Sequence, residues 1–369
     1  MRPLTTAPTW FPNHRDANWT APDPDPRVRD FHRGLDGYAP TPLTELPLIA
    51  TELGVAGFFA KDESHRLGLP AFKALGASWA IHRFLEEHSA RGASEVGPFT
   101  LVTASDGNHG RAVARFARRS GHAATIFVPH GVHVRAIEAI RAEGAQVVQV
   151  DGNYDDAVHA AAEMAADANT ILVQDTARDG YVEVPAWIVD GYNTLFTEID
   201  EQLGAVGVED PDLIAIPTGV GSLLQAALHH YRHPDRSTDT AVVAVEPDTA
   251  ASVFASIAAG QPVTVDTATT VMAGLNCGTV SPLAWPAITA GLDGALITTD
   301  ADATRAAHDL AALGVDAGPC GAAPLAALRA VLAGPDAGAI RHHVGLTDTS
   351  TVVVVITEGT AANPVHHTE

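Results

Sequence analysis

The sequence predicts an α/β fold of two lobes, each with a mostly parallel sheet flanked by helices. The first observation is a series of short, apolar, β-branched runs, and the second is the helical periodicity of the longer segments that follow them. The third is the length of 369 residues, well above the roughly 150 residues expected of one domain. Strands that alternate with helices favour parallel pairing, because a parallel connection needs a crossover of roughly a dozen residues or more.

The regular alternation begins after about forty residues that are rich in Pro, Asp and Arg and that predict an irregular arm lying over the body. Strands are expected at 57–61, 99–105, 124–129, 145–150, 170–175, 212–217, 241–246, 295–300 and 351–357. Helices are expected at 74–88, 109–120, 133–143, 154–168, 185–202 and 222–231. Because the strands cluster into two sets, we expect a small lobe at 72–175, set between 1–71 (the arm and the start of a large lobe) and 176–369 (its remainder).

Charge and hydropathy exclude several classes of partner. The chain has 22 basic and 44 acidic side chains, a formal net charge of −22, which repels nucleic acid and anionic lipid. The amino-terminal stretch has no apolar signal-peptide core, and no apolar run approaches the roughly 20 residues that span a bilayer. We therefore expect a cytoplasmic protein that binds neither nucleic acid nor membrane.

Cysteine and histidine give no sign of a metal centre. Cys277 and Cys320 are the only cysteines, too few for a disulfide framework and without the paired spacing of a zinc site. A disulfide between these two stays open at this point. The histidines show no HExxH or related spacing.

Lysine is scarce, and this narrows any lysine chemistry to Lys61 and Lys73. Lys73 follows a Gly-Leu-Pro loop and directly precedes an expected helix. A partly desolvated amine at a helix start has a lowered pKa and can condense with a carbonyl group. The apolar neighbours Ala71, Phe72 and Leu75 count against the alternative of a solvated surface lysine.

A polar turn at residues 105–110 (SDGNHG) lies between an expected strand and an expected helix. Ligands of open α/β folds bind at the carboxyl ends of such strands, where backbone N–H groups and short polar side chains are presented. The alternative is that Asp106 or Asn108 only caps the helix.

A glycine turn at residues 218–222 (TGVGS) follows the expected strand 212–217 and precedes a helix. Its glycines allow the backbone to approach an anion, and its hydroxyl groups and helix N-terminus supply donors. Leu224 occupies the third glycine position of a dinucleotide fingerprint, and the turn lacks the lysine of a P-loop. A single phosphate therefore fits better than a pyrophosphate.

A lysine before a helix, an asparagine turn, a glycine phosphate loop and a late strand ending in Thr357 occur here in the order found in the fold-type-II pyridoxal-phosphate (PLP) enzymes, which the chain resembles. Lys61, in FFAKDESHR, is similar to the early strand lysine of that family. Within the family, the resemblance is to the diaminopropionate ammonia-lyases and extends from about residue 40 to the end. It is carried by LPAFKALGASWA, TASDGNHGRAVA, VQDTARDGYVEVPAWIVDGY, MAGLNCGTVSPLAWP and ITEGTAANP.

The resemblance implies a PLP cofactor and a role for each matching residue. Lys73 would form the Schiff base, Asn108 would contact the phenolic oxygen, and Thr357 would face the pyridine nitrogen. The phosphate would be held by Thr218, Gly219, Val220, Gly221 and Ser222. Asp106 and Asp175 resemble the two acidic residues that remove the Cα proton, one for each substrate enantiomer.

The implied reaction is the elimination of ammonia from 2,3-diaminopropionate, an amino-acid substrate, by a homodimeric enzyme. Asp106 stands where generic dehydratases carry serine, and acidic side chains suit a substrate with a cationic β-ammonium group. The chain departs from the family pattern in its GVGS phosphate loop and in Cys320, where relatives often have serine. A threonine or serine dehydratase, a non-catalytic phosphate-binding protein and a structural protein remain the alternatives.

Overall fold

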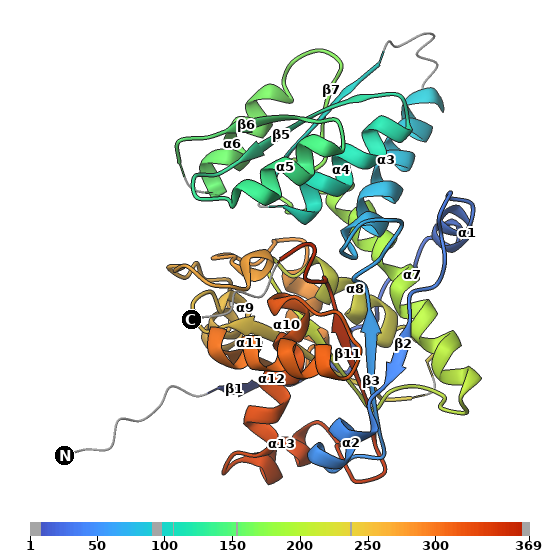
Figure 1. Ribbon diagram of the computed structural model, residues 1–369. Helices are drawn as coiled ribbons and strands as arrows, with labels where there is room; N and C mark the ends of the chain where they lie inside the picture. Colours follow the sequence, from blue (N-terminus) through green and yellow to red (C-terminus); the bar gives the residue numbers. More distant parts are fainter. Residues whose placement is uncertain (1–8, 91–97, 106, 153, 237, 364–369) are drawn as a thin grey trace, which may run out of the picture.

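The computed structural model describes residues 9–90, 98–105, 107–152, 154–236 and 238–363. Within them, the larger of two sheets contains, in spatial order, β1 (Trp10–Pro12), β10 (Gly294–Thr298), β9 (Ala241–Pro247), β8 (Leu213–Pro217), β11 (Thr351–Ile356), β3 (Gly57–Asp62) and β2 (Leu43–Glu45). The smaller sheet contains β6 (Gln146–Gln149), β5 (Ala123–Val128), β4 (Thr100–Ala104) and β7 (Thr170–Leu172). Figure 1 shows the two sheets as separate layered units, each covered by helices.

Strand pairing confirms the predicted α/β fold. All pairs in the smaller sheet are parallel. In the larger sheet only the edge strands β1 and β2 pair antiparallel. Strands covered on both faces are apolar throughout, and β11 is buried along its whole length. The lobe boundaries at residues 72 and 175 stay a prediction.

Each of the six predicted helices is present, as α3 to α8 in the list that follows. The helices are α1 (Arg27–Arg33), α2 (Pro47–Leu53), α3 (Lys73–Ala90), α4 (Asn108–Arg119), α5 (Val134–Ala142), α6 (Tyr154–Met164), α7 (Glu183–Ala205), α8 (Ser222–Tyr231), α9 (Ser252–Ala259), the 3-10 turn η1 (Ala273–Leu275), α10 (Trp285–Gly291), α11 (Asp300–Ala312), α12 (Pro319–Leu332) and α13 (Ala337–His343). The helix predicted to end near residue 168 ends at Met164, and α7 is longer than predicted at both ends. No helix among these is both long and apolar enough to cross a membrane.

The amino-terminal arm is more regular than predicted. Its strand β1 pairs with β10, and a side chain at Gly294 would clash with the ring of Trp10. In α1, the buried His32 contacts the Thr194 hydroxyl of α7 through Nδ1 at 2.7 Å and the Leu75 carbonyl of α3 through Nε2 at 3.1 Å. Elements this short show no periodicity, so tertiary contacts define them and the sequence pattern could not.

Helices α3 and α7 cross closely, and this crossing places the start of α3 (Figure 1). A Cβ atom at Gly191 would lie 2.7 Å from the Leu75 carbonyl oxygen, and one at Gly76 would lie 2.7 Å from the Tyr192 ring. Glycine at both positions is therefore required for the two backbones to approach. The first residue of α3 is Lys73, so the crossing also positions the lysine.

Candidate active site

The structure separates the roles of the two lysines. The Lys61 side chain is fully buried, and its Nζ donates to Glu198 Oε2 at 2.7 Å and to the Thr41 carbonyl at 2.7 Å. Arg66 pairs with the same Glu198 at 2.7 Å and with Glu63 at 2.6 Å. Burial lowers the pKa of Lys61, and the carboxylates partly oppose that shift. Lys61 therefore ties β3 to α7 and is not accessible for chemistry.

Lys73 lies in a different setting, with a fifth of its side chain exposed. Its Nζ donates to Asp175 Oδ2 at 2.5 Å. Burial would lower the pKa of Lys73, as expected from the sequence, but the attraction of the Asp175 carboxylate prevails and holds the pKa above its ordinary value, so the expected lowering was wrong. Burial likewise acts to raise the pKa of Asp175, and the Lys73 ammonium holds it well below its usual range. The pair is a proton donor and acceptor in direct contact.

The polar turn after β4 is closed by a serine. Ser105 Oγ accepts the N–H groups of Gly107 at 3.0 Å and of Gly110 at 2.8 Å. Ser105 thus supplies a capping oxygen at the start of α4, and the described bond of the Asn108 side chain goes to Glu358 instead. Asp106 itself lies outside the described residues.

Asn108 and His109, the first residues of α4, face opposite ways. Asn108 is half-buried, and its Nδ2 donates to Glu358 Oε2 at 2.7 Å. His109 is buried, with Nε2 at 2.7 Å from the Val173 carbonyl oxygen, and burial lowers the pKa of its ring. The histidine is structural, and Asn108 is directed to the end of β11.

The glycine loop 218–222 offers its backbone rather than its hydroxyl groups. Thr218 Oγ1 donates to the Ile216 carbonyl at 2.8 Å, and Ser222 Oγ donates to the Asp175 carbonyl at 2.8 Å. Within the described chain, the N–H groups of residues 219–221 donate to no protein acceptor. Unpaired N–H groups before a helix N-terminus form a cradle for an anion.

Gly221 fixes the shape of this loop. Its φ of +99° lies in the left-handed region, and a Cβ atom there would lie 3.0 Å from Ile288 Cδ1. At Gly219, a Cβ atom would lie 3.0 Å from Cys277 Sγ. The glycines therefore serve both a backbone conformation and a close approach.

Thr357 follows β11 and is buried, with 4% of its surface exposed. Its Oγ1 has no hydrogen-bond partner among the described residues. Its carbonyl accepts the N–H of Phe72 at 3.2 Å, which places Thr357 beside the residue before Lys73. A buried hydroxyl without a partner costs free energy, so Thr357 Oγ1 is available to accept or donate a hydrogen bond to a ligand at this position.

The predicted residues that the structure describes thus converge on the carboxyl ends of the central strands. The Ser222 hydroxyl donates to the Asp175 carbonyl, and Lys73 Nζ donates to the Asp175 carboxylate. The N–H of the residue before Lys73 donates to the Thr357 carbonyl. Asn108 joins this set through Glu358. These residues are far apart in the sequence and are joined by direct hydrogen bonds. Sequence spacing alone could not have shown those bonds.

Two further residues belong to the site that the sequence did not single out for a role. Gln174 Oε1 accepts from Thr103 Oγ1 at 2.9 Å, while its Nε2 donates to Tyr154 Oη at 2.9 Å and to Asp175 Oδ1 at 3.3 Å. Gln174 therefore orients Asp175. The other residue is Glu358. Its sequence signal is a charged residue placed soon after an apolar strand.

Cys277 and Cys320 do not form a disulfide, which answers the question that the sequence left open. Among the described residues, no group of three or more His, Cys, Asp or Glu side chains could hold a metal ion.

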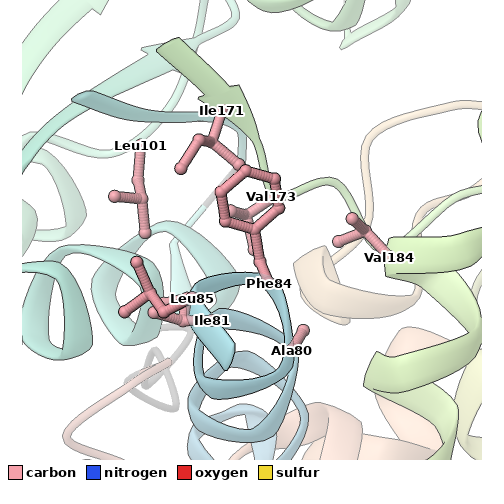
Figure 2. Close-up of a pocket in the computed structure, with 8 residues that line it drawn as sticks. All are labelled: Ala80, Ile81, Phe84, Leu85, Leu101, Ile171, Val173 and Val184. Atoms are coloured by element: carbon pink, nitrogen blue, oxygen red, sulfur yellow. The ribbon is translucent and has the colours of Figure 1, made fainter. Parts of the chain in front are cut away.

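A small pocket beneath the smaller sheet is not the site. Figure 2 shows that it is lined by aliphatic side chains and Phe84, from α3, β4, β7, the residue after β7 and α7. It contains no group that could bind phosphate or transfer a proton. It is a packing gap beneath the smaller sheet.

The arrangement fits PLP on three observations. Lys73 offers an amine for the aldehyde carbon, the 219–221 backbone offers unpaired N–H groups for the phosphate, and Thr357 would offer an unpaired hydroxyl for the ring nitrogen. A hydroxyl there, unlike a carboxylate, does not enforce a protonated ring nitrogen.

Comparisons with known proteins agree that the chain is related to PLP enzymes. The family described as pyridoxal-phosphate dependent enzyme matches residues 35–358. The diaminopropionate ammonia-lyase of Escherichia coli strain K12 is 34% identical over 354 residues, which cover 90% of this chain and 87% of that protein. The enzyme of the same name from Salmonella typhimurium is 37% identical over 279 residues, 71% of this chain and 69% of that one.

Among solved structures, the E. coli diaminopropionate ammonia-lyase in complex with an aminoacrylate-PLP azomethine reaction intermediate superposes with a TM-score of 0.84 at 31% identity, covering 96% of each chain. Its complex with D-serine gives a TM-score of 0.85 at 31% identity, covering 96% of this chain and 95% of the other. The chain is a PLP-dependent enzyme related to ammonia-lyases and dehydratases. It belongs to the family of pyridoxal-phosphate dependent enzymes of fold type II.

Proposed function

We propose that this enzyme eliminates ammonia from 2,3-diaminopropionate to give pyruvate and two molecules of ammonia. The observation that carries the proposal is the contact of Lys73 Nζ with Asp175 Oδ2 at 2.5 Å, next to an anion cradle. The relatives named diaminopropionate ammonia-lyase support it, because they align over most of this chain.

Each of the proposed site residues has a separate role. Bound PLP supplies an electron sink that acidifies the Cα proton of an amino acid. Lys73 would be the amine that condenses with a carbonyl carbon, and Asp175, whose Oδ2 lies against Lys73 Nζ, would accept the Cα proton of one substrate enantiomer. The phosphate is held by residues 218–222, the phenolic oxygen by Asn108 and the ring nitrogen by Thr357.

The substrate preference follows from charge. The β-amino group of diaminopropionate is cationic at neutral pH, and the carboxylate of Asp175 lies at the site with its pKa held low. Asp106, which stands outside the described residues, is the proposed second acid, and the two carboxylates would serve the two enantiomers. A neutral β-hydroxyl, as in serine or threonine, gains nothing from these charges.

Three further features belong to the proposal. The small lobe spans 72–175 between the arm and large-lobe segment 1–71 and the remainder 176–369. The active form is a homodimer. The enzyme works in the cytoplasm on a small amino acid and has no nucleic-acid or membrane partner, consistent with the net charge of −22.

A substrate panel tests the function. Purified enzyme is supplied with PLP, and ammonia and pyruvate are measured with D- and L-2,3-diaminopropionate, serine and threonine. The proposal expects kcat/KM for a diaminopropionate enantiomer to exceed that for the hydroxy amino acids by at least about a hundredfold. Equal or better turnover of serine or threonine would assign the enzyme to the dehydratases instead.

A further inference from the structure

Glu358 is a buried carboxyl group at the centre of the site to which the proposed function gives no task. It directly follows Thr357, and 3% of its surface is exposed. Its Oε2 accepts a hydrogen bond from Asn108 Nδ2 at 2.7 Å. A carboxyl group that is buried to this degree and bonded to a site residue calls for a physical account.

The surroundings of Glu358 hold it in place. A Cβ atom at Gly318 would lie 3.2 Å from Glu358 Oε1, and one at Gly274 would lie 3.9 Å from Oε2. The other groups that act most strongly on its carboxyl are neutral: the Cys320 thiol of α12 and the amides of Asn108 and Asn363. Burial raises the pKa of Glu358, and these donors partly oppose that shift.

The contact with Asn108 determines how that amide is turned. An asparagine amide carries an acceptor oxygen on one side and two Nδ2 hydrogens on the other, and the hydrogen-bond partners decide which side faces where. Glu358 Oε2 takes one Nδ2 hydrogen. The second Nδ2 hydrogen is then fixed in direction and remains free to donate to a ligand.

We propose that Glu358 is a positioning residue that acts through Asn108. It turns the Asn108 amide so that the remaining Nδ2 hydrogen points to the phenolic oxygen of PLP. The inference rests on the proposed function, because it takes the Asn108 contact from there. It adds that cofactor binding depends on a carboxyl group that does not itself touch the cofactor.

A double-mutant cycle between these two residues tests the inference. The dissociation constant of PLP is measured by titrating the apoprotein of wild type, Glu358→Leu, Asn108→Ala and the double variant. The pH midpoint of the visible absorbance band is measured in parallel, since it reports protonation of the imine nitrogen, which a hydrogen bond to the neighbouring phenolic oxygen shifts. Thermal unfolding of each apoprotein checks that the variants are folded.

Glu358→Leu removes the acceptor, so we expect the PLP dissociation constant to rise about tenfold and the absorbance midpoint to shift. In the Asn108→Ala background the same change should alter the constant by less than about twofold. Glu358→Gln retains an acceptor oxygen, and its loss should be smaller. It replaces Glu358→Leu in the cycle if that variant does not fold.

Glu246→Gln is the matched control. Glu246 is another fully buried carboxyl, bonded to the N–H groups of Val253 and Phe254 rather than to Asn108. Its substitution should leave the PLP dissociation constant and the absorbance midpoint at the wild-type values.

Two results would overturn the inference: wild-type affinity and spectrum in Glu358→Leu, or an equal loss with and without Asn108. A failure of the proposed function looks different. Wild-type enzyme that binds PLP yet releases no ammonia from 2,3-diaminopropionate would contradict the proposed substrate. The double-mutant cycle would still decide whether Glu358 acts through Asn108.

Discussion

Lys73 Nζ lies 2.5 Å from Asp175 Oδ2, although 102 positions separate the two residues in the chain. Lys73 begins α3, and Asp175 lies three residues past the end of β7. Each group holds the other in its charged form, since the pKa of Lys73 is raised and that of Asp175 is lowered. Removing either partner leaves a charge without a counter-charge in a largely buried site.

Asp175→Asn should therefore impair proton transfer. We expect kcat for diaminopropionate to fall at least about a hundredfold, because a positioned acid or base contributes that much or more. Asp179→Asn, on the same loop but exposed, should retain the wild-type rate. A kcat for Asp175→Asn within tenfold of wild type would remove Asp175 from the proton pathway.

Thr357→Val should separate cofactor binding from stability. The hydroxyl group has no partner in the described chain, so its removal should leave the unfolding free energy of the apoprotein unchanged or slightly raised. The dissociation constant of PLP should rise about tenfold, because the ring nitrogen loses its partner. Urea unfolding of the apoprotein and PLP titration measure the two effects, and a destabilised apoprotein with normal PLP affinity would contradict the assignment.

Gly221→Ala should distort the phosphate loop. The substitution combines a left-handed φ of +99° with a contact of 3.0 Å to Ile288, so we expect a loss of about 2 kcal/mol in unfolding free energy and weaker PLP binding. Gly260→Ala is the control, with a φ of +69° and open space around the position. It should cost about 1 kcal/mol and leave PLP affinity intact. Equal effects of both variants on PLP affinity would argue against the cradle.

His32 should make the fold sensitive to acid. Burial lowers the pKa of this ring from 6.5 to about 3, so between these values the unfolded chain binds a proton that the folded protein does not. Stability is therefore full above pH 6.5 and falls as the pH decreases through this window. From pH 7 to pH 5, the wild type should lose about 2 kcal/mol more than His32→Asn.

Denaturant unfolding at both pH values measures this difference. His130→Asn, at an exposed position, should follow the wild type. Parallel pH profiles for wild type and His32→Asn would show that His32 does not carry the acid sensitivity.

The sequence predicted the central strands and the six helices between them because their periodicity is strong and local. It failed for β1 and α1, since a three-residue strand and a seven-residue helix depend on pairing with β10 and on contacts of His32. Ser105, which the sequence did not predict for this role, supplies a capping oxygen at the start of α4.

The site was predictable as a set of turns at strand ends, but its internal bonds were not. Nothing in the spacing of residues 218–222 indicates that both hydroxyl groups bond to carbonyl groups and leave the backbone N–H groups for an anion. The partnership of Asn108 with Glu358 joins residues 250 positions apart, and only the assembled sheets bring them together.

Borohydride reduction followed by peptide mapping tests the central claim most directly. The chain contains only Lys61 and Lys73, so the site of attachment is unambiguous. PLP-loaded enzyme is reduced, digested and analysed by mass spectrometry. We expect loss of the visible absorbance and a phosphopyridoxyl group on Lys73 alone, and no such group in Lys73→Ala. A modified Lys61, or a chain that carries no phosphopyridoxyl group after reduction, would contradict the account.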